Sequence, residues 1–254
     1  MLNRKLIIKK TTKYIALSLI IVSLTGVNVF AADLSTEEQK AIPSSEESIK
    51  ASQEKIRKMS ERFKNVGKNN SNNLMAIPDV PYSKTLSTSG YINQPDNNTC
   101  GPTSAHNLLL NWGKNISLNT LKNDLQFDGK QTPFGDHWAK ALNKHTNSNY
   151  YNITWSPNQS TIWTAFLGCT VDGHPFILDT HMSSKNGYLV GYENSGKDYW
   201  HYVTGIGYSG ANLSDSYKKG VYHDPFNGRA GTYGVHSLEL PKWKALLAER
   251  GIVW

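Results

Sequence analysis

Cysteine is scarce in this sequence, because its 254 residues include only Cys100 and Cys169. Small secreted domains that are held together by several disulfides are therefore excluded. The two thiols allow one disulfide at most, and a Cys100–Cys169 bond would block thiolate chemistry and leave a stabilised binding module. We expect instead that Cys169 is a buried thiol at the end of an apolar helix and that Cys100 is free.

A hydrophobic run of membrane length is also missing after the N-terminal segment, which excludes a multi-span membrane protein. The formal charge of +7 first suggests a nucleic-acid partner, but five of the 27 basic residues precede the first acidic residue, Asp33. Without them, 22 basic residues stand against 20 acidic ones. The sequence has no phosphate-binding glycine loop and no compact zinc pattern, so we expect no nucleic acid, cofactor or metal.

Residues 1–31 have the three parts of a secretory signal peptide. A basic region ends at Lys13, an apolar core runs from Ile15 to Val29, and Ala31 offers a cleavage site. The alternative is an uncleaved anchor helix, but the core is short and is interrupted by polar residues. We expect a protein secreted by a Gram-positive bacterium, either free or associated with the cell wall, with no stable membrane insertion after cleavage.

Residues 32–80 contain no Trp, Tyr or Cys, and their eight basic and eight acidic residues cancel. An apolar seam between Ser44 and Val66 predicts a helix that begins near the Ser-Ser-Glu-Glu segment at 44–47. This helix is either an amphipathic element or stalk beside the next domain, or an inhibitory propeptide that acts within the same chain. The Asn-rich stretch 69–73 is typical of a linker.

Residues 81–254 hold all seven Trp and twelve of the thirteen Tyr, enough for one well-buried core. Periodicity and capping signals predict helices at 103–112, from 117, at 136–144, 160–167 and 241–249. Runs rich in β-branched and aromatic residues predict strands at 150–155, 175–180, 188–192, 201–208 and 220–224. Helices that precede strands indicate an α+β fold with an antiparallel sheet.

The segment from Gln94 to Ser104 carries the strongest chemical signal. A loop rich in Asn, Asp and Pro leads to Cys100, and the Gly-Pro pair that follows begins a helix with Pro102 at its first position. The unpaired amides and dipole of a helix N-terminus favour the thiolate, which is the nucleophilic form of cysteine. The side-chain amide of Gln94 and the backbone amide of Cys100 can form an oxyanion hole.

A cysteine nucleophile needs a base and a group that orients the base. His201 opens a strand with small residues, and Asp224 ends the strand that follows. Antiparallel pairing of these strands would place Asp224 beside His201, which would hold the imidazole with one nitrogen free towards Cys100. His223 would point to the opposite face of its strand, so we interpret it as structural.

Four motifs occur in order along residues 81–240. They are Gln94 six positions before Cys-Gly-Pro, the Gly-His-Pro strand at 173–175, the His-Tyr-Val strand from 201, and the Tyr-His-Asp-Pro segment ending at 225. In these features the sequence resembles papain-like cysteine peptidases of the bacteriocin-leader type, the double-glycine peptidases (family C-thirty-nine), and especially their stand-alone secreted relatives.

The resemblance implies a papain-like fold and metal-free cleavage of a peptide or protein substrate through a thioester. It assigns the nucleophile to Cys100, the base to His201, the orienting carboxylate to Asp224 and the oxyanion donor to Gln94. The sequence contains no transporter, so cleavage after Gly-Gly is not implied. An amidase or transamidase, or a non-catalytic surface-binding module on the same fold, remain alternative functions.

Overall fold

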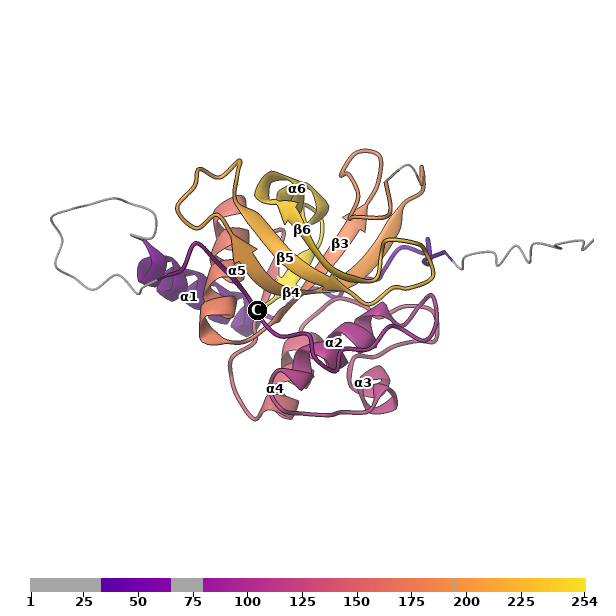
Figure 1. Ribbon diagram of the computed structural model, residues 1–254. Helices are drawn as coiled ribbons and strands as arrows, with labels where there is room; N and C mark the ends of the chain where they lie inside the picture. Colours follow the sequence, from indigo (N-terminus) through magenta and orange to yellow (C-terminus); the bar gives the residue numbers. More distant parts are fainter. Residues whose placement is uncertain (1–32, 65–79, 194) are drawn as a thin grey trace, which may run out of the picture. The chain divides into compact units, whose positions relative to one another are not determined.

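The computed structural model describes residues 33–64, 80–193 and 195–254, all within one compact unit, Ala31–Trp254. The expected signal peptide and the linker at 69–73 lie outside these residues. Across the described ranges there are six helices and seven strands (Figure 1). None of these helices has both the length and the hydropathy needed to cross a membrane.

The elements alternate less regularly than in a repeating α/β fold. The helices are α1 (Glu46–Phe63), α2 (Cys100–Leu110), α3 (Leu118–Asp124), α4 (His137–Thr146), α5 (Gln159–Asp172) and α6 (Leu240–Leu246). The strands are β1 (Ser83–Thr85), β2 (Ile153–Trp155), β3 (Phe176–Met182), β4 (Tyr199–Ser209), β5 (Lys219–Asp224), β6 (Gly234–Glu239) and β7 (Gly251–Val253).

All seven strands join one sheet in the order β2-β7-β3-β4-β5-β6, with β1 added to β4. Every neighbouring pair is antiparallel. The prediction of an α+β fold with helices packed on an antiparallel sheet is therefore confirmed. The strand β4 is the longest and pairs with β1, β3 and β5, so it forms the centre on which the helices are placed.

The sheet has a separate hydrophobic core on each face. Alternate residues of β3 divide between them, because Phe176 and Leu178 belong to one cluster and Ile177 belongs to the other. The first cluster includes residues of α1, α5 and α6, and the second includes residues of α2, α3 and α4. Figure 1 shows α2, α3 and α4 grouped together, away from α6.

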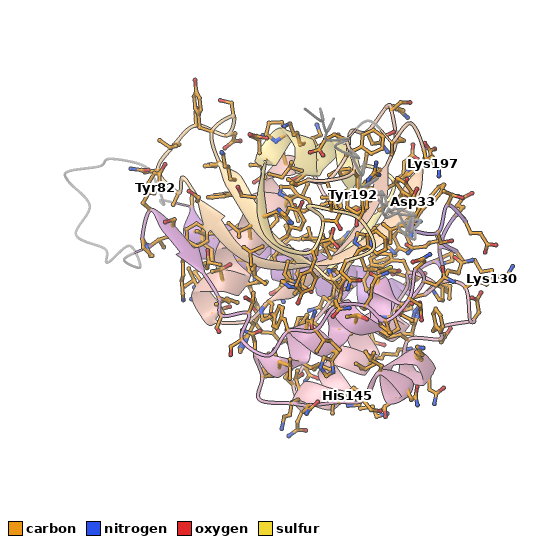
Figure 2. The ribbon with its side chains drawn as sticks, turned by 45° about the vertical axis from the view of Figure 1, so that its right-hand side comes forward. Asp33, Tyr82, Lys130, His145, Tyr192 and Lys197 are labelled. Atoms are coloured by element: carbon orange, nitrogen blue, oxygen red, sulfur yellow. The ribbon has the colours of Figure 1, made fainter. Side chains whose placement is uncertain are left out.

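The described chain begins beside the start of β4. The carboxylate of Asp33 accepts a hydrogen bond from the Tyr199 hydroxyl at 2.8 Å and from Lys197 Nζ at 3.0 Å. Figure 2 labels Asp33 and Lys197 in the same part of the molecule. The next residue, Leu34, is buried in the first core. This N-terminal segment is therefore part of the packed unit.

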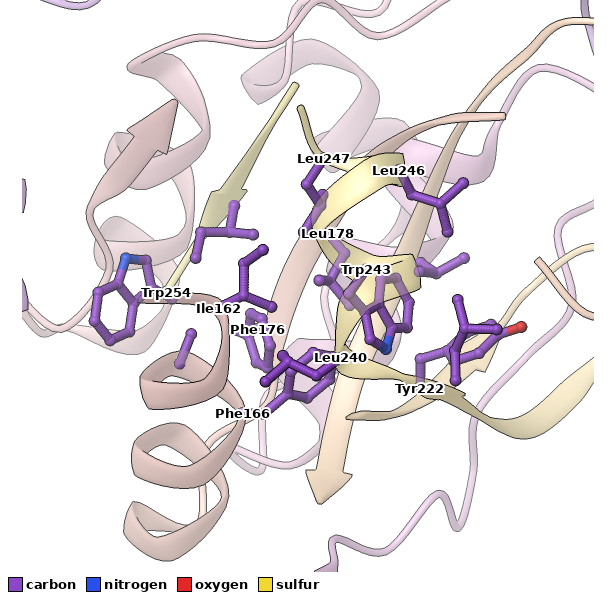
Figure 3. Packing of buried hydrophobic residues seen from close by; sticks show 14 of the residues in the cluster. Ile162, Phe166, Phe176, Leu178, Tyr222, Leu240, Trp243, Leu246, Leu247 and Trp254 are labelled. Atoms are coloured by element: carbon purple, nitrogen blue, oxygen red, sulfur yellow. The ribbon is translucent and has the colours of Figure 1, made fainter. Parts of the chain in front are cut away.

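Aromatic side chains fill the first core between α5, the sheet and α6. The Phe166 ring lies 5.0 Å from Phe176 and 5.4 Å from Trp243, centroid to centroid (Figure 3). Phe166 also lies directly over Gly220 of β5, where an added Cβ would come within 2.3 Å of the ring. A glycine is needed at this position because the ring approaches the backbone so closely.

Helix α1 begins and packs much as its sequence predicts. The hydroxyl of Ser45 caps it by accepting the Ser48 amide at 3.2 Å. Met59 and Phe63 are buried against α5, where the absence of a side chain at Gly168 allows close approach. α1 is therefore an amphipathic helix that packs on α5 within the same compact unit.

Some predicted elements are wrong or incomplete. Residues 188–192 form turns and irregular structure instead of a strand, and they place Tyr192 in the interior. The last helix ends at Leu246, and Gly251 begins the short strand β7. The strands β1, β6 and β7 were not predicted, because two of them have three residues each and β6 alternates partly exposed side chains.

The packing of α1 predicts unequal effects of substitutions at two adjacent residues. Met59→Ala removes a buried side chain and should lower the free energy of unfolding by about 2 kcal/mol or more. Lys58→Ala, on the exposed side, should change it by less than about 0.5 kcal/mol. Denaturant unfolding of both variants measures this difference, and equal values would contradict the packing of α1 on α5.

Candidate active site

Cys100 is the first residue of α2. The helix begins at Cys100, before the predicted range of 103–112, and Pro102 is its third residue instead of its first. The capping residue, Thr99, makes no side-chain cap bond. Within the described residues, the amides of Cys100 and Gly101 also have no hydrogen-bond acceptor. The N-terminus therefore directs unpaired N–H groups and a positive dipole end at the position of the thiol.

The first turn of α2 is fixed against β4 by two hydrogen bonds. The Ser104 hydroxyl donates to the carbonyl of Tyr202 at 3.0 Å, and the Thr204 hydroxyl donates to the carbonyl of Ser104 at 3.3 Å. On another side, Gly101 lies against Thr132, where an added Cβ would approach within 2.6 Å of the hydroxyl oxygen. The position of Cys100 therefore depends on tight packing on both sides of the turn.

His201 and Asp224 meet as the sequence predicts. Their side chains project from β4 and β5, and His201 Nε2 lies 2.8 Å from Asp224 Oδ1. Both residues are fully buried. His223 points the other way, and its ring contacts Tyr91. The alternation of side chains along β5 thus turns Asp224 towards His201 and the adjacent His223 away from it.

The charges around His201 favour its protonated form. Burial alone would lower the pKa of this imidazole, but the Asp224 carboxylate and the Cys100 thiol outweigh burial and raise the pKa well above its usual range. Because the Cys100 thiol is among the groups that raise this pKa, it lies near the imidazole. Nε2 faces Asp224, so Nδ1 is the nitrogen left for Cys100, and Nδ1 forms no hydrogen bond to any of the described residues.

Gln94 is held beside the residues that follow Asp224. Its backbone amide donates to the carbonyl of Pro225 at 2.8 Å, and its side-chain Nε2 donates to the carbonyl of Asp96 at 2.7 Å. Gln94 is 2% exposed. The bond to Asp96 fixes the side-chain amide and uses one of its two hydrogens, so a second hydrogen remains available to a ligand.

A buried tyrosine that the sequence analysis did not identify lies beside the His201–Asp224 pair. The Tyr192 hydroxyl donates to Asp224 Oδ2 at 3.2 Å and lies 3.5 Å from His201 Nε2. Figure 2 labels Tyr192 near the loop that carries Lys197. No local motif marks this residue, because its role in the cluster arises only when the loop folds back over the ends of β4 and β5.

The segment before α1 pairs with a loop next to the candidate nucleophile. Phe134 donates its amide to the carbonyl of Lys40 at 2.9 Å and accepts the Ile42 amide at 2.8 Å. The Lys40 amide donates to the side chain of Gln131 at 2.7 Å. Residues 40–42 therefore lie as a short strand along the loop that packs Thr132 against Gly101. Cys100 is only 4% exposed in this arrangement.

His174, Asp179 and His181 are residue types that bind metals, but each has an ordinary protein partner. Asp179 forms a buried ion pair with Arg250 at 2.7 Å, and burial raises its pKa to about 6 despite this partner. His174 stacks on Trp112, and His181 stacks on Trp200. In the ranges that the structure describes, no group of three or more His, Cys, Asp and Glu side chains is arranged to hold a metal.

The two cysteines are both free and buried, so the alternative of a Cys100–Cys169 disulfide is not found. Cys169 lies on α5 and is fully buried, as expected. Burial raises the pKa of this thiol to about 11, which keeps it protonated at neutral pH. Of the two cysteines, only Cys100 has an imidazole and an uncapped helix N-terminus near it.

Comparison with known sequences identifies a family. The model of the Peptidase C39 like family matches residues 87–247, which include Gln94, Cys100, His201 and Asp224. The search of curated proteins found no match. The fold described above is consistent with the papain-like expectation, whereas the leader-processing, double-glycine type stays a prediction.

The different surroundings of the two thiols predict different reactivity. In the native protein at neutral pH, iodoacetamide should alkylate Cys100 much faster than Cys169, because only thiolate reacts and Cys169 is both protonated and enclosed. Peptide mass mapping over time gives both rates. In His201→Ala the rate at Cys100 should fall while Cys169 stays slow, so the difference should shrink, and a wild-type protein that labels both thiols equally would contradict this assignment.

Proposed function

The chain belongs to the Peptidase C39 like family, and from this premise we propose that it is a cysteine peptidase in which Cys100, His201 and Asp224 form the catalytic triad. The observation that carries the proposal is the His201–Asp224 hydrogen bond of 2.8 Å. That bond leaves Nδ1 of the imidazole for the cysteine at the start of α2. A nucleophile, a base and an orienting carboxylate are the parts that acyl transfer requires.

The reaction begins with transfer of the Cys100 proton to Nδ1 of His201. The thiolate then attacks the carbonyl carbon of the peptide bond, and the resulting tetrahedral intermediate carries a negative oxygen. His201 returns the proton to the leaving nitrogen, the C–N bond breaks, and an acyl-thioester forms on Cys100. Water, deprotonated by His201, attacks the thioester and releases the acid product and the free thiol.

Gln94 and the Cys100 amide are proposed to stabilise the negative oxygen. The support is that the Gln94 side chain is fixed by Asp96 with one hydrogen unused, and that the Cys100 amide is unpaired. Each such donor is worth about 3 kcal/mol in the transition state. Because both donors are held before substrate arrives, little reorganisation is needed during the reaction.

We also propose that the peptidase acts outside the cell that makes it. The support is the three-part sequence of residues 1–31, which lies outside the described structure. N-terminal sequencing of the protein from the culture medium tests this proposal. A mature chain that begins near Ala32 supports export, whereas an intact Met1 in the cell fraction contradicts it.

Substitutions in the proposed triad should abolish or slow peptide cleavage, whereas a substitution at the other cysteine should not. Cys100→Ala should abolish cleavage of peptide substrates, because no thioester can form, and His201→Ala should lower kcat by about a hundredfold to ten-thousandfold. Cys169→Ala, which removes the fully buried thiol of α5, should keep activity near wild type.

A panel of peptides analysed by mass spectrometry measures this cleavage. Products that gain the mass of water indicate hydrolysis, and products joined to an added amine indicate a transamidase. A biological activity that survives Cys100→Ala would favour the binding-module alternative and contradict the peptidase proposal.

Residues 40–42 are proposed to restrain the site within the same chain. The support is their strand-like pairing with Phe134, next to the Thr132–Gly101 contact that borders Cys100. An extended peptide that approaches Cys100 from this side would compete for the same backbone groups. The wider segment 33–63 holds residues 40–42 in place through Leu34, Met59 and Phe63, which are buried in the core.

Two substitutions at one position test this restraint. Ile42→Pro removes the amide that donates to Phe134, whereas Ile42→Ala keeps it. Ile42→Pro should therefore lower the KM for an extended peptide by about threefold to tenfold relative to Ile42→Ala, the effect of losing one hydrogen bond. Steady-state kinetics measure the ratio, and an equal KM in both variants would contradict the restraint.

A further inference from the structure

Tyr192 makes a contact that neither its burial nor its packing requires. The side chain is fully buried in the first core, and its ring lies 6.1 Å from the ring of Phe226 in a stacked arrangement. A phenylalanine would make the same ring contacts. The hydroxyl, however, is directed at the triad, where it lies 3.2 Å from Asp224 Oδ2 and 3.5 Å from His201 Nε2.

The Asp224 carboxylate has defined donors on both oxygens. Oδ1 accepts His201 Nε2–H and the Phe226 amide, each at 2.8 Å. Oδ2 accepts the Tyr192 hydroxyl, and no other donor reaches it among the described residues. Without Tyr192 this oxygen would be buried with no hydrogen bond, and the carboxylate would gain freedom to rotate away from the imidazole.

We propose that Tyr192 is a positioning residue for the His201–Asp224 pair: its hydroxyl fixes the Asp224 carboxylate so that the imidazole keeps its hydrogen on Nε2 and presents Nδ1 to Cys100. The effect of Tyr192 on catalysis rests on the proposed function. Its effect on the position of the Asp224 carboxylate does not depend on that function. Tyr192 acts through Asp224 and touches no reacting atom.

The hydroxyl also moderates the charge that Asp224 presents to His201. A donated hydrogen bond disperses part of the carboxylate's negative charge, so the imidazolium is stabilised less than it would be by an unshared carboxylate. Cys100 and Asp179 act on His201, and Tyr222 and His223 interact with the charge of Asp224. Asp179 is paired with Arg250, and among the described residues only the Tyr192 hydroxyl donates a hydrogen bond to Asp224 Oδ2.

The matched control is Tyr222, a second buried tyrosine. Its hydroxyl accepts the amide of Val190, in the same loop as Tyr192, but makes no hydrogen bond to His201 or Asp224. Tyr222→Phe and Tyr192→Phe each delete one buried hydroxyl that is hydrogen-bonded. A general loss of stability should therefore affect both variants alike, whereas a positioning role should affect only Tyr192→Phe.

The experiment is an NMR titration of the full chain with ¹⁵N-labelled histidine, with His201 assigned from a His201→Gln spectrum. In Tyr192→Phe the titration midpoint of His201 should rise by about one pH unit, since the carboxylate charge is no longer shared. The share of the Nε2–H tautomer should fall. Asp224→Asn removes the charge and should move the midpoint down, and Tyr222→Phe should leave it unchanged.

Kinetics on a cleaved peptide give the functional half of the test. Tyr192→Phe should lower kcat by about tenfold to a hundredfold, the range for one hydrogen bond to a charged group, and should leave KM unchanged. If Tyr192→Phe does not fold, 3-fluorotyrosine at position 192 replaces it, since this stronger donor should move the His201 midpoint down.

The outcomes are distinguishable. An unchanged midpoint and tautomer in Tyr192→Phe, or equal changes in Tyr222→Phe, would overturn the positioning role. A midpoint that moves as expected in a protein whose wild type cleaves no peptide would support the positioning role while refuting the proposed peptidase function.

Discussion

The buried hydrogen bond between His201 and Asp224 is the constraint on which the site depends. A carboxylate enclosed by protein is costly unless every oxygen has a donor, and the surrounding chain supplies them from three places. The imidazole comes from β4, the Phe226 amide follows β5, and the Tyr192 hydroxyl comes from a loop. The β4–β5 register and the path of that loop are therefore parts of one arrangement that must form together.

The position of Cys100 is determined by a different set of contacts. The side chain and carbonyl of Ser104 tie the first turn of α2 to β4, while Thr132 borders Gly101. The thiol and the imidazole thus lie in one region because both are attached to β4, the imidazole directly and the thiol through the helix. A single strand therefore supports both residues that the proposed mechanism uses as nucleophile and base.

Local signals in the sequence pointed to the residues of the candidate site, but they did not predict the segments that enclose it. The Gly-Pro pair after Cys100 indicated a helix start, and alternation along β5 separated Asp224 from His223, so the proposed triad could be identified before the fold was known. The pairing of Lys40 with Phe134 joins segments more than 90 residues apart, and no local pattern specifies it. The sequence analysis did not identify Tyr192 for the same reason, because its hydrogen bonds form only after distant segments have come together.

The pairing of residues 40–42 with Phe134 also limits how the N-terminal segment can move away from the candidate site. Loss of the whole N-terminal segment would uncover core positions at Leu34, Met59 and Phe63, and it would strip Gln39 from the buried guanidinium of Arg250. Each exposed core side chain costs about 2 kcal/mol, whereas each of the two backbone hydrogen bonds at Phe134 contributes about 1 kcal/mol. Local release of residues 40–42, with the rest of the segment still packed, is therefore the opening that requires the least free energy.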